Sequence, residues 1–318
     1  MEKWILLILT AVAVSPVCAQ NPTDHEWKVT LKVVDDTGQP VVGANASVGY
    51  YSQSRPASID GLTDTNGIFM AAHSAKSGHL GFSAEKSGYY TTREASYDLG
   101  FAYDATRWNP VQTIILKKIG QPIPLHARNA RIEIPKVGEA VGFDLVEYDW
   151  VAPYGKGKRS DLICLADRRW VSRNDFDCAL RVTFTDKGDG FIPVSVPPNQ
   201  GSKLRLAAIA PSEGYVAELS KSLGNTPVGG WKDDEREGNK GQNYYFRVRT
   251  VLDDQGNVVS ALYGKIHDDF ALDPINSKTL KILFTYYLNP TPNDRNVEFD
   301  TKRNLAKNVK PLEEVKAP

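Results

Sequence analysis

The chain has 318 residues, and its 38 Lys and Arg side chains balance its 38 Asp and Glu side chains, so the formal net charge is zero. This balance argues against a nucleic-acid-binding protein and against a protein held to an anionic membrane by charge, because both need an excess of basic residues. Glycine, proline and tyrosine are frequent, with 25, 19 and 14 residues, whereas methionine occurs only twice. Such a composition favours an all-β protein of short strands joined by turns.

The first 19 residues have the layout of a secretory signal peptide. Lys3 supplies a positive charge, an apolar run extends over 4–14, and small residues end at Ala19, after which we expect cleavage. The run is shorter than the roughly 20 apolar residues of a membrane-spanning helix, and no later stretch is long and apolar enough. We therefore expect an exported protein, periplasmic or extracellular, with no transmembrane segment in the mature chain.

Cys18 invites comparison with the lipobox of bacterial lipoproteins, in which a small residue stands directly before the lipid-modified cysteine. Here the bulky Val17 occupies that position. The sequence therefore favours ordinary cleavage that discards Cys18, with lipid attachment as the alternative.

Residues 20–119 are predicted to form a first β domain. Apolar and polar residues alternate from Trp27 to Val33, which is the period of a half-buried strand. A turn is expected over 35–38, where Asp side chains can bond nearby N–H groups and glycine can take a positive φ. Further strands are expected over 42–48, 68–70, 79–86 and 111–116.

Three motifs follow one another in this domain. They are Gly38-Gln39-Pro40-Val41-Val42-Gly43-Ala44, Thr63-Asp64-Thr65-Asn66-Gly67-Ile68-Phe69 and Lys86-Ser87-Gly88-Tyr89. Over about 27–118 the chain thereby resembles the carboxypeptidase regulatory-like domain, a small transthyretin-like β-sandwich. The resemblance implies an accessory domain without catalytic residues, of the kind found beside peptidases and repeated in bacterial envelope proteins. The stretch 91–110 departs from the family pattern, and we expect a long loop whose aromatic side chains pack on the sandwich.

A linker is predicted at 120–124, where one glycine and two prolines disfavour regular pairing. Residues 120–302 are then expected to form a second β-rich domain, a β-sandwich or jelly-roll-like fold. The longest helical pattern, 215–223, covers only about two turns. Residues 303–318 contain few apolar side chains and are expected to be a disordered tail. The strands of the second domain are predicted over 131–134, 141–150, 161–166, 176–184, 203–209, 244–252, 258–265 and 280–287.

Two segments of the second domain, 244–265 and 284–296, look like the C-terminal part of uncharacterised secreted bacterial proteins. Those proteins pair this region with a carboxypeptidase regulatory-like domain. The resemblance implies no activity.

Cys164 and Cys178 are the cysteines that remain after cleavage of a signal peptide. Each lies in step with the apolar residues of its strand, and a hairpin centred on Val171 would place them directly opposite one another. In an oxidising compartment we therefore predict a disulfide, which would contribute roughly 3 kcal/mol in the chain-entropy model. The alternative is two reduced cysteines that pack as small apolar side chains.

The sequence contains no recognisable catalytic or metal-binding motif. The five histidines are scattered without His-Glu-x-x-His spacing, and Gly-x-Ser-x-Gly and phosphate-binding loops are absent. A metal site at 267–269 and a calcium loop at 186–190 are less favoured than simple turns, because their oxygen ligands lack the required spacing. We therefore predict no catalytic residues, no metal and no cofactor.

Aromatic side chains remain as candidates for binding. Neighbouring residues of a strand point to opposite faces, so some rings can lie on the surface and stack on a sugar. Trp150, Tyr154 and Trp231 are the candidate ligand-binding residues. The leading hypothesis is an exported, non-enzymatic two-module protein that binds an unknown envelope protein or a glycan. The alternatives are a carbohydrate-binding protein that uses the exposed aromatics of the second domain, and a hydrolase, or hydrolase accessory, with an unrecognised site.

Overall fold

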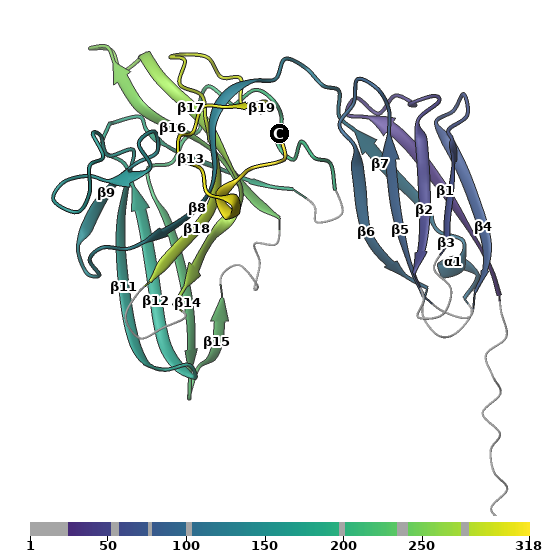
Figure 1. Ribbon diagram of the computed structural model, residues 1–318, viewed down its shortest axis with the longest axis horizontal. Helices are drawn as coiled ribbons and strands as arrows, with labels where there is room; N and C mark the ends of the chain where they lie inside the picture. The colour runs from purple at the N-terminus through teal and green to yellow at the C-terminus, as the bar shows by residue number, and fades with distance from the viewer. Residues whose placement is uncertain are drawn as a thin grey trace, which may run out of the picture.

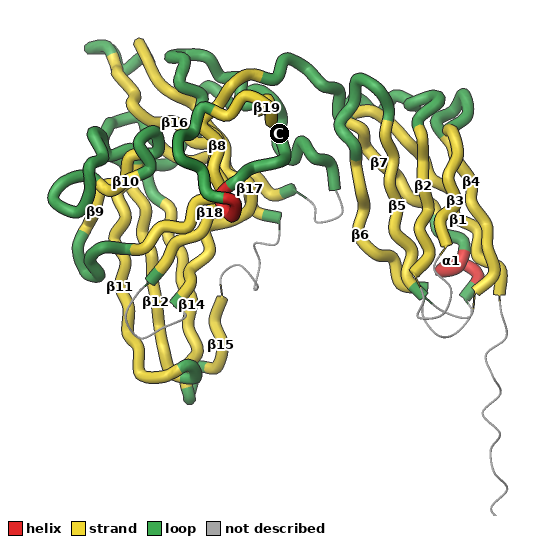
Figure 2. The backbone as a smooth tube through the Cα atoms, viewed as in Figure 1, coloured by secondary structure: helices red, strands yellow, loops and turns green. Residues whose placement is uncertain are grey.

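The computed structural model describes residues 25–51, 57–75, 78–99, 104–196, 201–233, 241–274 and 280–318. These residues form two β-sandwiches, joined between strands β7 and β8 (Figures 1 and 2). The predicted all-β class is confirmed. The predicted signal peptide and Cys18 lie outside the described residues. Within the described part of the chain, no helix is long and apolar enough to cross a membrane.

The first sandwich packs a three-stranded sheet, in the order β4-β1-β7, against a four-stranded sheet, in the order β3-β2-β5-β6. Strand β1 pairs antiparallel with β4 and parallel with β7. Its elements are β1 (His25–Asp35), β2 (Asn45–Tyr51), β3 (Ala57–Leu62), β4 (Ile68–Ala75), β5 (His79–Glu85), β6 (Thr92–Asp98), the short helix α1 (Ala105–Trp108) and β7 (Val111–Leu116).

The core of the first sandwich is apolar. The alternation predicted for β1 is confirmed, since Trp27, Leu31 and Val33 are fully buried. The turn after β1 also forms as expected: the Asp35 carboxylate accepts hydrogen bonds from backbone N–H groups of the turn, and Gly38 has a φ of 82°. The expected long loop over 91–110 instead contains β6 and α1, and Trp108 of α1 is fully buried.

The second sandwich packs two six-stranded sheets, in the orders β10-β9-β11-β12-β14-β15 and β13-β16-β17-β18-β8-β19. Phe143, Leu162, Phe246 and Phe284 are among the buried residues that fill the space between the sheets. The elements are β8 (Ile123–Glu133), β9 (Ala140–Asp144), β10 (Asp149–Trp150), β11 (Leu162–Ser172), β12 (Asp175–Thr183), β13 (Gly190–Ser195), β14 (Leu219–Thr226), β15 (Gly230–Asp233), β16 (Gln242–Leu252), β17 (Val258–Asp273), β18 (Lys281–Leu288), β19 (Phe299–Asn304) and the 3-10 turn η1 (Pro311–Glu313).

Two local predictions for the second sandwich were wrong. The stretch 141–150 is two strands, because the Asp144 carboxylate accepts backbone hydrogen bonds from Val146 and Glu147 and so stabilises a turn between them. The stretch 203–209 forms no strand, although some of its leucines are buried. The short helical pattern at 215–223, from which no helix was predicted, contains the start of β14.

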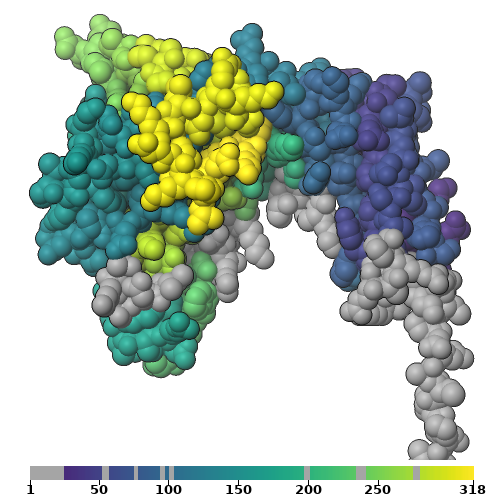
Figure 3. Space-filling view, viewed as in Figure 1, coloured from purple at the N-terminus to yellow at the C-terminus, as the bar shows by residue number. Residues whose placement is uncertain are grey.

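The C-terminal residues pack on the second sandwich, where they cover one face of it (Figure 3). Glu313 is buried and forms an ion pair with the buried Arg128. Val315 is 8% exposed, and the Tyr287 hydroxyl donates a hydrogen bond to the carbonyl of Ala317 at 3.1 Å. The prediction of a disordered tail was therefore wrong, because a buried ion pair and a few contacts replace the apolar residues that the tail lacks.

The register of the β11–β12 hairpin keeps the two cysteines apart. Cys164 lies opposite Val182, whereas the residue opposite Cys178 is Arg168. The cysteines are thus offset by four residues, or about 13 Å along a strand, whereas a disulfide needs Cα atoms within about 7 Å of each other. Both thiols are free and buried. The predicted disulfide is wrong, because the hairpin is centred two residues beyond Val171.

The two sandwiches meet at a junction made of hydrogen bonds. Glu298, which is 1% exposed, accepts a hydrogen bond from the Tyr90 hydroxyl of the first sandwich at 2.7 Å. The same carboxylate accepts backbone hydrogen bonds from Gly120 and Gln121, each at 2.8 Å. A single buried carboxylate of the second sandwich therefore binds both the first sandwich and the segment that joins the two.

A second contact at the junction joins two backbones. The Arg93 N–H donates to the carbonyl of Gly201 at 3.1 Å, and a Cβ atom on Gly201 would lie 1.4 Å from the carbonyl oxygen of Arg93. The Lys117 ammonium also donates to the carbonyl of Arg205 at 2.6 Å. This close approach of the two backbone segments therefore requires glycine at position 201.

Candidate functional site

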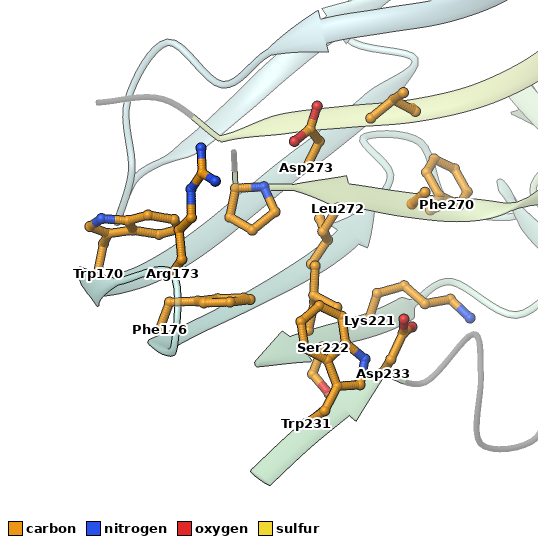
Figure 4. A pocket seen from close by; sticks show the side chains of 14 residues that line it. Trp170, Arg173, Phe176, Lys221, Ser222, Trp231, Asp233, Phe270, Leu272 and Asp273 are labelled. Atoms are coloured by element: carbon orange, nitrogen blue, oxygen red, sulfur yellow. The ribbon is translucent and has the colours of Figure 1, made fainter. Parts of the chain in front are cut away.

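A pocket of about 640 Å³ lies between the two sheets of the second sandwich, beside the β11–β12 hairpin (Figure 4). Most of its lining is apolar: Trp170, Phe176, Leu223, Trp231, Phe270, Ala271, Leu272, Pro274 and Leu283. The remaining lining residues are polar or charged: Arg173, Lys221, Ser222, Asp233 and Asp273. Its volume and its mainly apolar lining with a few polar groups are typical of sites that bind small ligands.

Strand pairing brings the aromatic residues of one wall together. Trp170 of β11 lies opposite Phe176 of β12, Phe176 lies opposite Asn225 of β14, and Asn225 lies opposite Trp231 of β15. The rings of Trp170 and Phe176 are stacked, with centroids 5.4 Å apart, and the rings of Phe176 and Trp231 meet edge to face at 5.9 Å. We call Trp170, Phe176 and Trp231 the aromatic row.

The β11–β12 hairpin, which carries Trp170 and Phe176, has a tight turn and an irregularity in its pairing. The pairing shifts between Trp170 and Ser172, so that Val171 is an extra residue on β11 and is 64% exposed. The Ser172 hydroxyl accepts a hydrogen bond from the Asn174 N–H at 3.2 Å, across the turn. A bulge of this kind redirects the neighbouring side chains, and here Trp170 remains on the pocket side of the sheet.

The opposite wall comes from the other sheet. Phe270 and Leu272 of β17 and Leu283 of β18 line the pocket. Phe270 is 3% exposed, and its ring lies 4.7 Å from the ring of Phe284 in the core. The pairing of β17 with β18 shifts between His267 and Ala271, just where β17 reaches this wall. The pocket is thus continuous with the hydrophobic core of the sandwich.

A buried ion pair links the two sheets at the pocket. The Lys221 ammonium of β14 bonds the Asp269 carboxylate of β17, and these side chains are only 7% and 2% exposed. Asp269 also accepts hydrogen bonds from the Tyr244 hydroxyl at 2.7 Å and from the Phe270 N–H at 2.8 Å. Burial, followed by the hydrogen bond to Asp269, raises the pKa of Tyr244, so its hydroxyl remains a donor. Lys221 and Phe270 line the pocket, whereas Asp269 and Tyr244 do not.

The other charged lining residues differ in their partners. Asp233 and Asp273 already interact with other groups of the protein. Arg173, in the turn of the hairpin, forms no hydrogen bond or ion pair within the described part of the chain. Arg173 is therefore the charged residue of the pocket whose charge is not compensated by a protein partner.

The structure separates the three predicted ligand-binding residues. Trp231 lines the pocket and is 44% exposed. Tyr154 is 39% exposed but lies outside the pocket, and its hydroxyl donates to Glu139 at 2.7 Å. Trp150 is 8% exposed, and its indole N–H donates to the carbonyl of Glu133 at 3.0 Å. The prediction for Trp150 was wrong, because this ring belongs to the core.

Trp170 and Phe176 were not among the ligand-binding residues predicted from the sequence. Both flank the short turn of one hairpin, and that pattern of two aromatic residues around a turn was visible in the sequence. Their convergence with Trp231 was not visible, because it depends on the pairing of β12 with β14 and of β14 with β15. The sequence signal was therefore present for two of the three residues of the aromatic row, Trp170 and Phe176.

The side chains around the possible metal sites have other partners. His267 is buried, and its Nδ1 lies 3.0 Å from the Tyr287 hydroxyl, whereas Asp269 bonds Lys221. In the segment 186–190, Asp189 accepts backbone hydrogen bonds from residues of β16. Among the residues described by the structure, no three His, Cys, Asp or Glu side chains are grouped so as to hold a metal ion.

No protein-family model and no curated protein matches the chain. Solved structures with some similarity include a 3-chlorocatechol 1,2-dioxygenase from Rhodococcus opacus, at 16% identity and a TM-score of 0.23, over 31% of this chain and 62% of the dioxygenase. A DUF3823 family protein from Parabacteroides merdae is 8% identical, with a TM-score of 0.22 over 86% of this chain and 98% of that protein. Invasin, a bacterial integrin-binding protein, is 12% identical, with a TM-score of 0.18 over 84% of this chain and 54% of invasin. These scores are too low to transfer a site or an activity to this chain.

Proposed function

We propose that this is an exported, non-enzymatic binding protein whose second sandwich binds carbohydrate in the pocket between its sheets. The observation that carries the proposal is the aromatic row, which stands beside charged and hydroxyl side chains in one pocket. A sugar ring has an apolar C–H face and a rim of hydroxyl groups. Aromatic side chains stack on the apolar C–H face, and side chains such as Lys221, Ser222 and Asp233 form hydrogen bonds with the hydroxyl groups.

The proposed export rests on the layout of the first 19 residues. The proposed accessory role of the first sandwich rests on its resemblance to the carboxypeptidase regulatory-like domain. In this account the first sandwich supports the second through the hydrogen bonds of Glu298 to Tyr90, Gly120 and Gln121. The ligand site belongs to the second sandwich alone.

The proposal is tested by a glycan array on the purified protein, followed by titration of its tryptophan fluorescence with the oligosaccharides that bind. We expect saturable binding that Trp231→Ala weakens at least tenfold. Tyr154→Ala is the matched control, because it removes another partly exposed aromatic ring outside the pocket. Absence of binding to any glycan, or equal affinity of the Trp231→Ala variant and the wild type, would contradict the proposal.

A further inference from the structure

We infer that the pocket selects a carbohydrate that carries a carboxylate, an acidic sugar of the uronic acid class, and that Arg173 and Lys221 are the residues that bind this group. The inference rests on the proposed carbohydrate function and names the ligand class of the same pocket. It follows from which hydrogen-bonding groups of the pocket have partners and which do not.

The ammonium group of Lys221 has more N–H donors than the described part of the chain uses. An ammonium group has three N–H donors, and within the described residues one carboxylate, Asp269, accepts from Lys221. Because Asp269 neutralises its charge, the side chain can be buried at 7% exposure without a ligand. Its remaining donors are available to oxygen atoms of a ligand in the pocket that Lys221 lines.

Arg173 supplies charge without a protein partner. It lies beside Trp170 of the aromatic row, at the turn of the hairpin (Figure 4). A guanidinium presents its N–H groups as a planar fork that matches a carboxylate in two parallel hydrogen bonds. A sugar stacked on the aromatic row would place its substituents within the same pocket as this fork.

The acidic lining residues Asp233 and Asp273 each have an interaction partner in the protein. Among the described lining residues, the charged groups with donors available to a ligand are Arg173 and Lys221. A neutral sugar would leave the charge of Arg173 without a partner, whereas an uronic acid would supply one.

The test compares trimers of galacturonic, glucuronic and mannuronic acid with their methyl esters, which keep the ring and remove the charge. We expect at least one acid to bind tenfold or more tightly than its ester, and this preference to fall as salt is raised, since salt screens exposed charges. If esters bind as tightly as acids, the selection is overturned while carbohydrate binding stands. If neither acids nor esters bind and a glycan array is also silent, both are overturned.

Two variants assign the effect to residues. Arg173→Gln should bring the acid and its ester to within threefold of each other, whereas Arg169→Gln, on the same hairpin and paired with Asp175, should keep the preference. Lys221→Met alone leaves Asp269 buried without its cation, so the double variant with Asp269→Asn is used, with its melting temperature as the check of folding. Unchanged acid preference in both the folded double variant and Arg173→Gln would overturn the assignment.

Discussion

The two sandwiches differ in the polar and charged side chains that they bury. In the first, the fully buried large side chains are apolar, and Trp27 and Trp108 lie inside the core. In the second, buried charged residues occur on both sheets, among them Lys221, Lys265 and Asp269. The aromatic residues differ as well, since the aromatic row of the second sandwich lines a pocket, although Phe176 also belongs to the core. The two sandwiches therefore differ in the groups that they bury, and the pocket of the proposed function lies in the second.

The largest expected effect is on the core of the first sandwich. Trp27→Ala removes a fully buried ring and should lower the free energy of unfolding by about 3–5 kcal/mol. Trp231→Ala, at a position that is 44% exposed, should cost less than about 1 kcal/mol while it abolishes most of the binding. Denaturant unfolding of both variants checks this. Equal losses of stability would remove the distinction between core and pocket rings.

The next effect concerns a buried lysine of the second sandwich. Lys265 is fully buried, its Nζ atom has no hydrogen-bond partner among the residues that the structure describes, and burial lowers its pKa to about 7. Since the unfolded chain holds this proton up to a pKa of about 10.4, the unfolded state binds more protons at this site between these values, and the contribution of Lys265 to stability should rise with pH from about 7 to about 10. Each pH unit in this window is worth up to about 1.4 kcal/mol.

Lys265→Met should remove this slope and raise the melting temperature at neutral pH. Lys32→Met, on the exposed side of β1 in the first sandwich, is the control and should leave the slope in place. Calorimetry at several pH values between 7 and 10 makes the comparison. An unchanged slope in the Lys265→Met variant would show that the lysine is not the group responsible.

A smaller effect is expected at the junction. Gly201→Ala places a Cβ atom 1.4 Å from the carbonyl oxygen of Arg93, so the two backbones must separate, at a cost of about 1–3 kcal/mol. Limited proteolysis should then cut the segment between the sandwiches faster than in the wild type. Gly49→Ala is the control, because its Cβ atom would meet only the Tyr51 side chain. Equal cleavage rates would show that this contact does not hold the sandwiches together.

Reducing agent is expected to leave the melting temperature unchanged. Burial raises the pKa of the Cys164 thiol to about 12 and that of Cys178 to about 11, so both should resist alkylation until the protein unfolds. Melting curves with and without reductant should coincide. A lower melting temperature in reductant would contradict the hairpin register that separates the two cysteines.

Sequence patterns predicted the parts of the fold that depend on neighbouring residues. The alternation from Trp27 to Val33 and the turn at Asp35 follow from local periodicity and local hydrogen bonds, and both are present. The burial of Trp150 was not predictable in this way. Its indole N–H bonds the carbonyl of Glu133, a residue of another strand, and only the folded arrangement of the sheets brings the two together.

Less of the candidate site than of the fold could be predicted from the sequence. Val171 is an extra residue on β11, and this bulge accompanies a shift of the hairpin centre that also removed the predicted disulfide. The pairing of Phe176 with Asn225 and of Asn225 with Trp231 joins segments far apart in the chain. Trp231 was chosen from its residue type alone, whereas its neighbours in the pocket come from long-range pairing.

The most direct test of the central claim is a calorimetric titration of the wild type and of the Trp170→Ala/Trp231→Ala double variant with an oligosaccharide that the array identifies. Both proteins should unfold at similar temperatures, because both rings are partly exposed. We predict saturable binding at one site for the wild type and no measurable heat for the variant. Wild-type affinity in the folded double variant would contradict the assignment of carbohydrate binding to the aromatic row.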